Sequence, residues 1–324
     1  MEEAVVIGAG PCGLSAAIEL QKIGIDPLVI EKENVVHSIY LYPTYMQFFS
    51  TPELLEIGDY PFSTPNEKPT RQEALTYYRT VASRRQLRVR PYQRVTEIGT
   101  AGDGAYKLTV ADASGRVNIV EARHVIVATG YFDQPNLLGI PGEQLPKVSH
   151  YFREAHPYAG TKVTVIGGSN SAVDAAMELL RAGAEVTVVY RGDTYSPVIK
   201  PWVRPIFESM VNKERIRMWF GSRVTRIDEA SVTVVKDGQE HTIENDFVLA
   251  LTGFHPDRSL LRAVGAAFRD DDEVPLFDPE TMETTCPGIY IAGVAASGRN
   301  ANEVFIETGR NHGVWIARHI ASKR

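Results

Sequence analysis

The stretch VVIGAGPCGLSAAIEL, residues 5–20, decides the fold. An apolar strand leads into the glycine-rich turn Gly8–Gly13, and the turn opens an alanine-rich helix expected from about Pro11 to Ile23. A second strand then ends in the acid Glu31. Glycines in such a turn let backbone N–H groups and the positive end of the helix approach a pyrophosphate, and the acid can accept hydrogen bonds from a ribose diol. The order and spacing therefore predict a βαβ unit that binds a dinucleotide.

A second stretch repeats this pattern with two departures. A strand from Lys162 leads into Gly167-Gly168-Ser169-Asn170-Ser171-Ala172, a helix to about Ala182 and a further strand that ends in Arg191. Ser169 replaces the middle glycine and Ala172 the last, which the motif tolerates because alanine still permits close packing of helix on strand. The arginine attracts the 2′-phosphate of NADP, which an acid would repel. We therefore predict a second nucleotide site, the alternative being a surface arginine at a strand end.

Two buried-type strands end alike, residues 124–130 in Ala-Thr-Gly and residues 247–253 in Leu-Thr-Gly. Such paired exits are where a chain leaves one nucleotide domain for another and later returns. A closing strand, residues 288–293, follows the return. The predicted fold class is α/β, with two Rossmann-like dinucleotide-binding domains, the second inserted in the first. Residues 1–134 and 252–324 form the first domain, and residues 135–251 form the second.

Further elements are expected between the two motifs and at the end of the chain. Thr70-Arg-Gln-Glu73 is a capping box that begins a helix to about residue 86. A final helix is expected over residues 302–320. A small antiparallel sheet in the crossover is predicted from alternating segments near residues 95–98, 105–111 and 117–121.

Composition limits the function classes. The 324 residues are 44% apolar and 23% charged, which is typical of a soluble globular protein, and the net charge of -6 gives little attraction to nucleic acid or anionic lipid. The chain enters a strand at once, without a signal peptide, and no apolar run reaches membrane-spanning length. We expect a cytoplasmic homo-oligomer that binds neither nucleic acid nor membrane. The two cysteines form no disulfide framework, and no Cys/His cluster has metal-ligand spacing, so no metal is expected.

Two dinucleotide sites in one chain favour electron transfer between a nicotinamide and a flavin. Together with the closing Ile291-Ala292-Gly293, the two motifs and exits resemble the flavoprotein family typified by low-molecular-weight thioredoxin reductase, over essentially the whole chain. The resemblance implies a thioredoxin-reductase-like fold, with FAD in the end-built domain and NADPH in the inserted one. The absence of Cys-x-x-Cys excludes an ordinary thioredoxin reductase. Val294 stands where most relatives have an Asp that binds the flavin's ribityl chain or phosphate, so those contacts are expected from the backbone of residues 295–302.

Five segments resemble a narrower group, the bacillithiol disulfide reductase family. They are the Gly-Pro-Cys-Gly turn with Cys12 and residues 40–51, 148–158, 195–202 and 300–309. This resemblance implies an NADPH-dependent FAD oxidoreductase that reduces bacillithiol disulfide, the oxidised form of a small cytoplasmic thiol that some bacteria use in place of glutathione. A small-molecule disulfide is accordingly the expected partner.

Cys12 is the expected catalytic residue. The helix N-terminus favours its thiolate while the FAD pyrophosphate disfavours it, so we expect a modest pKa shift. The chemistry would run through a mixed disulfide between Cys12 and one half of the substrate, resolved by reduced flavin. The alternative is that Cys12 is a small apolar filler in the first turn of the helix. Cys286 is expected to be buried and inert.

The residues expected to bind the two cofactors lie at turns, strand ends and helix starts. Tyr40 is expected near the flavin ring. The last helix, opened by Asn302 and Glu303, is expected to direct its N–H groups at the flavin N1/O2 edge. The full set is Gly8, Gly10, Pro11, Cys12, Gly13, Glu31, Lys32, Tyr40, Thr129, Gly130, Gly167, Gly168, Ser169, Asn170, Ser171, Arg191, Gly253, Gly293, Asn302 and Glu303.

Three alternatives stay open. Asn170-Ser171 with Asp174, and the histidine-aromatic segment before the second motif, also resemble flavin monooxygenases, although their Phe-x-Gly fingerprint is not cleanly present. A ferredoxin or flavodoxin NADP reductase has the same fold without Cys-x-x-Cys. A nicotinamide-sensing protein without turnover would contain no yellow cofactor.

Overall fold

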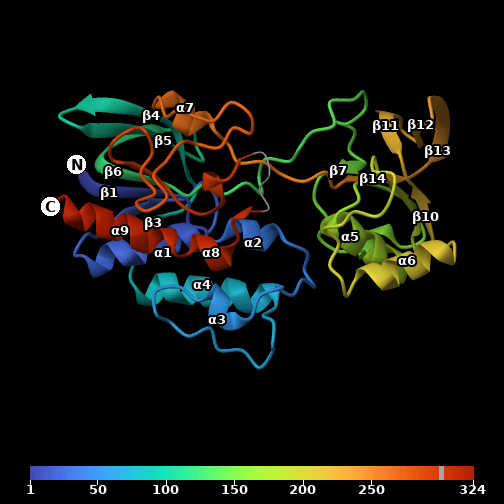
Figure 1. Ribbon diagram of the computed structural model, residues 1–324, viewed down its shortest axis with the longest axis horizontal. Coiled ribbons are helices and arrows are strands. Elements are labelled where there is room, and N and C mark those ends of the chain that lie inside the picture. Colours follow the sequence, from blue (N-terminus) through green and yellow to red (C-terminus); the bar gives the residue numbers. More distant parts are fainter. Residues whose placement is uncertain (299–302) are drawn as a thin grey trace. The chain divides into compact units, whose positions relative to one another are not determined.

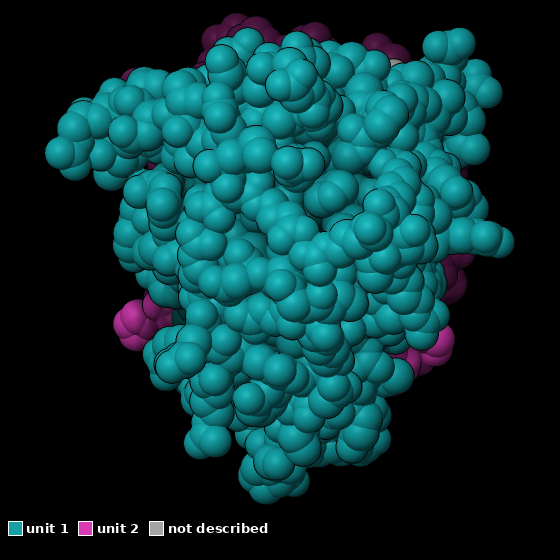
Figure 2. Space-filling view, turned by 90° about the vertical axis from the view of Figure 1, so that its left-hand side faces the viewer, with its two compact units in different colours: residues 1–134, 254–324 teal, residues 135–253 magenta. Residues whose placement is uncertain are grey.

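The structure is a computed structural model that describes residues 1–298 and 303–324. The chain divides into two compact units, which Figure 2 colours separately: unit 1 is residues 1–134 with 254–324, and unit 2 is residues 135–253. Unit 1 is thus built from both ends of the chain, and unit 2 is built from its middle.

Unit 1 combines strands and helices, most of which Figure 1 labels. Its strands are β1 (Glu2–Ile7), β2 (Leu28–Ile30), β3 (Arg88–Arg90), β4 (Gln93–Gly102), β5 (Ala105–Asp112), β6 (Val117–Val127) and β15 (Ile289–Ile291). Its helices are α1 (Pro11–Lys22), α2 (His37–Leu41), α3 (Pro52–Leu55), α4 (Arg71–Arg84), α7 (Ser259–Ala263), α8 (Ile306–Gly309) and α9 (His312–Ser322), with a 3-10 turn, η2, at Gly293–Ala296.

Among the described residues, the strands of unit 1 form one sheet. Strands β3, β2, β1 and β6 run parallel in that order, and β15 pairs in parallel with β6. The predicted antiparallel strands are confirmed, since β5 pairs antiparallel with both β4 and β6, but they extend this same sheet and do not form a small sheet of their own. Strand β6 has 11 residues and serves both parts: residues 117–122 pair with β5 and residues 122–127 pair with β1.

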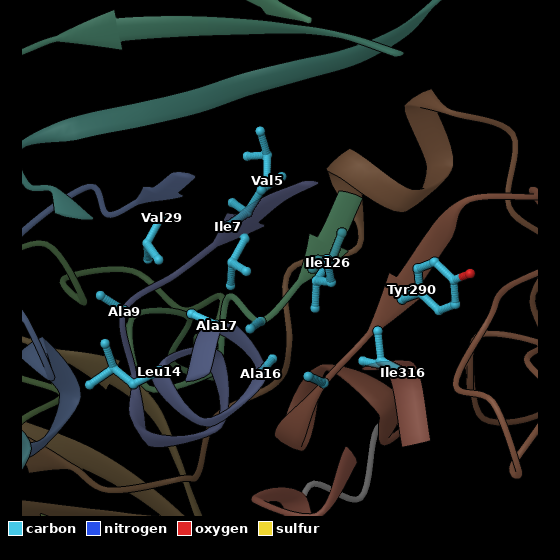
Figure 3. Close-up of a cluster of buried hydrophobic side chains, with 14 of the residues drawn as sticks. Val5, Ile7, Ala9, Leu14, Ala16, Ala17, Val29, Ile126, Tyr290 and Ile316 are labelled. Atoms are coloured by element: carbon cyan, nitrogen blue, oxygen red, sulfur yellow. The ribbon is translucent and has the colours of Figure 1, made fainter. Parts of the chain in front are cut away.

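The core of unit 1 lies between this sheet and helices α1 and α9 (Figure 3). Val5 of β1, Ile126 of β6 and Tyr290 of β15 are fully buried there. Leu14 of α1 and Ile316 of α9 are equally buried. Burying such side chains is the main stabilising term for a unit of this kind, at about 25 cal/mol for each Å² of apolar surface.

The helices α1 and α9 pack against each other without an intervening side chain. A Cβ added at Gly313 of α9 would lie 2.6 Å from the Cα of Ala16 in α1. The hydroxyl of Ser15 also donates to the Arg310 carbonyl, at 2.7 Å. The C-terminal segment is therefore fixed to the helix that the first glycine-rich turn opens.

Unit 2 has a five-stranded parallel sheet among its described residues, in the order β10-β9-β8-β14-β7. Its strands are β7 (Val148–Ser149), β8 (Lys162–Ile166), β9 (Glu185–Val189), β10 (Ile216–Trp219) and β14 (Phe247–Ala250). An antiparallel sheet contains β11 (Ser222–Ile227), β12 (Ser231–Lys236) and β13 (Gln239–Glu244). The helices are α5 (Asn170–Arg181) and α6 (Arg204–Asn212), with a 3-10 turn at His156–Tyr158.

The predicted capping box is confirmed. The Thr70 hydroxyl accepts from the Glu73 N–H at 3.2 Å, and the Glu73 carboxylate accepts from the Thr70 N–H at 2.8 Å. These bonds satisfy two N–H groups at the start of α4, which runs from Arg71 to Arg84.

The predicted single final helix is wrong. The chain forms a short α8, a turn at Arg310 and Asn311, and then α9 from His312. Gly309, a poor helix former, ends α8 where the backbone passes close to Cys12. Glu303 is exposed and precedes α8, so it does not open the last helix, and Asn302 lies outside the described residues.

Candidate dinucleotide-binding sites

The three glycines of the first turn have different surroundings. A Cβ added at Gly8, whose φ is +109°, would lie 2.4 Å from the Ala128 carbonyl oxygen, and one at Gly13 would lie 2.0 Å from the Gly8 carbonyl oxygen. A Cβ added at Gly10 would meet nothing within 4 Å. Gly8 and Gly13 are therefore required for packing, whereas Gly10 leaves open space beside the backbone, where a pyrophosphate can approach.

The start of α1 has no side-chain cap. Gly10 is the N-cap residue and Pro11 is the first helical residue, where the missing N–H of proline costs nothing. The N–H groups of the first turn of α1, which begins at Pro11, therefore have no side-chain partner among the described residues and are available to an anion.

Glu31 already organises the turn. It is 7% exposed, and its carboxylate accepts from the N–H of Ala9 at 2.7 Å and of Glu33 at 2.9 Å. A ribose hydroxyl would be a further donor to the same carboxylate. The neighbouring Lys32 forms an ion pair with Asp133, so a cofactor contact from Lys32 stays a prediction.

The first exit offers an unpartnered hydroxyl. The Thr129 Oγ1 is buried and has no hydrogen-bond partner among the described residues. It follows Ala128, whose carbonyl packs against Gly8, and precedes Gly130, which has a φ of +72°. Since buried hydroxyls are usually bonded, this atom fits a site completed by a bound group.

Cys12 is packed more tightly than its sequence context suggests. The residue as a whole is partly exposed, but its Sγ would lie 2.9 Å from a Cβ added at Gly293 and 2.8 Å from one added at Gly309. Burial raises the pKa of the Cys12 thiol to about 12. The expectation of a modest pKa shift is therefore wrong, because desolvation of the thiolate outweighs the field of the helix N-terminus.

Gly293 follows the closing strand β15 and is hydrogen-bonded to the last helix, α9. Its φ is +68°, and its N–H donates to Nδ1 of His312 at 3.2 Å. Burial lowers the pKa of His312 to about 4, so the ring is neutral at neutral pH and accepts this bond. The ring stacks on Trp315 with 5.3 Å between centroids.

Arg258 fixes the turn that follows Gly293. This side chain is 7% exposed and donates to the carbonyl oxygens of Ala295, at 2.7 Å, and of Ser297. Burial lowers the pKa of Arg258 to about 10, which leaves it charged at neutral pH. Sequence reasoning did not identify Arg258 or His312, because neither belongs to a motif and each acts on a backbone group distant in the sequence.

Tyr40 lies in α2 and is 40% exposed. The guanidinium carbon of Arg71 lies 5.4 Å from the centre of its ring, and Arg71 donates to its carbonyl oxygen at 2.6 Å. These contacts fix Tyr40 on α4, and its expected place near the flavin ring stays a prediction.

The second turn has the same backbone with different contacts. A Cβ added at Gly167, whose φ is +141°, would lie 2.5 Å from the Leu251 carbonyl oxygen. A Cβ added at Gly168 would lie 2.3 Å from the ring of Tyr190. Ser169 is the exposed N-cap residue of α5 and makes no capping hydrogen bond, and Ser171 is also exposed. The second exit ends at Gly253, with a φ of +90°.

The side-chain amide of Asn170 is engaged by backbone. Its Nδ2 donates to the Val198 carbonyl at 2.9 Å, and its Oδ1 accepts from the Lys200 N–H at 2.9 Å. A nucleotide contact from Asn170 is therefore expected from its main chain.

Arg191 is positioned for an anionic ligand. It follows the end of β9, it is exposed, and within residues 1–298 and 303–324 its guanidinium has no hydrogen bond or ion pair. A free guanidinium at this position fits the 2′-phosphate of NADPH.

Two further properties concern metals and membranes. In the described part of the chain, no group of three or more His, Cys, Asp or Glu side chains is arranged to hold a metal ion. No helix in the same residues has the length and apolar character required to cross a membrane.

These features define a class of protein. Among residues 1–298 and 303–324, one turn combines open backbone, an unpartnered hydroxyl and a buried acid, and the other carries an unpaired arginine. This is the layout of an oxidoreductase with FAD and NADPH sites. When bound, FAD would accept two electrons from the nicotinamide and pass them on.

The chain belongs to the pyridine nucleotide-disulphide oxidoreductase family, which matches residues 5–293. It is 51% identical to "Bacilliredoxin reductase Bdr" of Bacillus subtilis (strain 168), over 99% of this chain and 98% of that protein. The structure of "Bacillithiol Disulfide Reductase Bdr (YpdA)" from Bacillus cereus is also 51% identical, covers 100% of this chain and 99% of its own, and superimposes with a TM-score of 0.98. The predicted fold class, family, flavoprotein disulfide reductase activity and cofactors FAD and NADP(H) are confirmed.

The alternative classes are more distant. A ferredoxin–NADP reductase of Ignicoccus hospitalis is 30% identical over 90% of each chain. A flavin-containing monooxygenase of Arabidopsis thaliana is 26% identical over 89% of this chain and 70% of its own.

Proposed function

We propose that this enzyme reduces bacillithiol disulfide to bacillithiol with NADPH as the electron donor, in the cytoplasm and as a homo-oligomer. One observation carries the proposal: a single thiol, Cys12, lies in the first dinucleotide turn of a chain whose full-length relatives are named for bacillithiol disulfide and bacilliredoxin. The reaction consumes one NADPH and one proton for each disulfide and releases two thiols and NADP⁺.

We assign FAD to unit 1 and NADPH to unit 2. Gly10, Thr129 and Glu31 support the first assignment, because they offer open backbone, an unpartnered hydroxyl and a carboxylate around one turn. The exposed, unpaired Arg191 supports the second.

We assign the thiol exchange to Cys12. Its thiolate attacks one sulfur of the substrate, forms a mixed disulfide and displaces the other half as a thiolate, which takes a proton. Two electrons and a proton, drawn from NADPH, and one further proton from solvent then cleave the mixed disulfide into the Cys12 thiol and a second bacillithiol.

This role requires a change in the surroundings of Cys12. A thiol with a pKa of about 12 is almost fully protonated at neutral pH. Substrate binding must therefore open the contacts with Gly293 and Gly309 and favour the thiolate. The rate of exchange is expected to rise with pH, since alkaline solution increases the thiolate fraction.

The test is an anaerobic reoxidation. The protein is first reduced with one equivalent of NADPH, and bacillithiol disulfide is then added while the absorbance of oxidised flavin is followed. We expect rapid return of the oxidised spectrum, and no return with glutathione disulfide as the matched control. A flavin that stays reduced with bacillithiol disulfide contradicts the proposal.

A second candidate substrate is the disulfide form of a bacilliredoxin. The name of the Bacillus subtilis relative, bacilliredoxin reductase, favours this substrate. The same experiment separates the two candidates: return of the oxidised spectrum with oxidised bacilliredoxin, but not with bacillithiol disulfide alone, assigns the protein substrate.

A further inference from the structure

The segment of residues 195–202 lies against the start of α5 in unit 2. The first helical residue of α5, Asn170, bonds the segment through both ends of its amide, at 2.9 Å to the Val198 carbonyl and 2.9 Å to the Lys200 N–H. The segment is thereby fixed beside the N–H groups that a dinucleotide pyrophosphate would approach.

The same segment is anchored in the core on its other side. Ile199 is 4% exposed and belongs to the apolar core of unit 2. The ring of Tyr195 meets the rings of Phe220, at 4.9 Å between centroids, and of Phe207, at 6.0 Å. One side of the segment is therefore buried in the core, and the other side is held in place by the hydrogen bonds of Asn170.

The exposed side chains of the segment suit a nucleotide. Val198 and Trp202 are each 55% exposed, although both are large and apolar. Between them, the Nζ of Lys200 lies 5.8 Å from the centre of the Trp202 ring. A cation beside an aromatic ring offers a charge to a phosphate and a flat surface to a base.

We propose that Asn170 is a positioning residue, which holds residues 195–202 as a wall for the pyrophosphate and nicotinamide riboside that NADPH and NADH share. The proposal rests on the assignment of the nicotinamide nucleotide to unit 2. It gives Asn170 a role different from that of Arg191: Arg191 selects the 2′-phosphate, whereas Asn170 acts on the common part of both nucleotides through Lys200 and its neighbours.

The test is calorimetric binding of NADP⁺ and NAD⁺ to the FAD-loaded full chain. Asn170→Ala removes both hydrogen bonds and is expected to weaken NADP⁺ and NAD⁺ by the same factor, about tenfold. Lys200→Gln leaves those bonds in place, because they use the backbone of Lys200, and is expected to weaken both nucleotides by a smaller, equal factor. Asn212→Ala, an exposed residue at the end of α6, is the matched control with unchanged affinity.

The outcomes separate the possibilities. In each variant, equal losses of affinity for NADP⁺ and NAD⁺, with the NADPH preference and the flavin content retained, support the proposal. Unchanged affinity in either variant, or a loss confined to NADP⁺, overturns it; if Asn170→Ala fails to fold, the result with Lys200→Gln decides. The calorimetric assay contains no disulfide, so its result can be interpreted even if bacillithiol disulfide proves not to be the substrate.

Discussion

The two dinucleotide turns have the same backbone but different closures. In unit 1, Cys12 packs against Gly293 and Gly309, and α9 is fixed to α1 at Gly313. In unit 2, the corresponding residue Ser171 is exposed, and so is the N-cap residue Ser169. The C-terminal segment of the chain therefore covers the first turn at Cys12 while Gly10 stays open, whereas the second turn is exposed at both Ser169 and Ser171.

The charged residues that follow β2 and β9 also differ in exposure, as the two turns do. Glu31 is buried and already bonded to the N–H groups of Ala9 and Glu33, so it forms part of the structure of its turn. Arg191 is exposed and unpaired in the described residues. This difference fits the proposed assignment of a resident FAD to the first turn and of an exchanging NADPH to the second.

The largest expected effect comes from Cys12, the thiol that the second turn lacks. Cys12→Ala should retain FAD and its reduction by NADPH but lose turnover with bacillithiol disulfide, because no mixed disulfide can form. Steady-state turnover and anaerobic flavin reduction measure the two steps separately. A variant that reduces the disulfide at the wild-type rate shows that Cys12 only packs against Gly293 and Gly309.

A matched pair of glycine substitutions compares packing with binding inside the first turn. Gly13→Ala places a Cβ 2.0 Å from the Gly8 carbonyl oxygen, so we expect loss of flavin and a fall in Tm. Gly10→Ala meets no protein atom within 4 Å, and its φ of -73° suits alanine, so Tm without flavin should hold while FAD affinity falls. Flavin absorbance and thermal unfolding of the apoproteins provide the measurements. Equal flavin affinity in Gly10→Ala and the wild type would contradict the proposal that the pyrophosphate lies beside Gly10.

The assignment of NADPH to the second turn is tested with Arg191→Ala. Loss of a charge-assisted contact with the 2′-phosphate commonly costs roughly 1.5 to 3 kcal/mol, or about ten- to a hundred-fold in affinity. The KM for NADPH should rise by that factor while the KM for NADH changes little. An equal rise for both nucleotides would contradict the assignment.

The smallest effect concerns pH and the closure of unit 1. The usual pKa of histidine is 6.5, and burial lowers that of His312 to about 4, so between these values the unfolded chain binds a proton that the native chain does not. The contribution of His312 to stability is therefore complete above the unfolded pKa and is lost as the pH falls toward the folded pKa, by roughly 3 kcal/mol at most. Thermal release of flavin, followed by fluorescence between pH 7.5 and 4.5, measures it. The temperature of flavin release should fall less with decreasing pH in His312→Asn than in the wild type. Parallel pH profiles would contradict the role of neutral His312 as the acceptor of the Gly293 N–H.

The sequence predicted those parts of the fold that local patterns determine. Both βαβ units, the capping box at Thr70 and the α/β class follow from residue spacing, and the structure has each of them. The break between α8 and α9 was not predicted, and the structure places Gly309, the last residue of α8, beside the Cys12 Sγ. Burial also raises the pKa of Cys12: a motif indicates a helix N-terminus, but only packing shows how far the thiol is desolvated.

Side-chain roles in the site were less predictable than backbone roles. Asn170 belongs to a nucleotide motif, yet its amide bonds residues 198 and 200, which no local pattern connects to it. Arg258 and His312 act on the turn after Gly293 from distant parts of the sequence. Such pairings arise from the tertiary fold, so a single sequence carries no signal for them.

The most direct test of the difference between the two turns is the nucleotide content of the chain after exposure to both cofactors. The protein is incubated with excess FAD and NADP⁺, passed through a desalting column, denatured, and analysed for released nucleotides. The account predicts close to one FAD for each chain and almost no NADP⁺, because the C-terminal segment covers the first turn at Cys12, whereas the second turn is exposed at Ser169 and Ser171. Retention of NADP⁺ with loss of FAD, or retention of both in equal amounts, would contradict it.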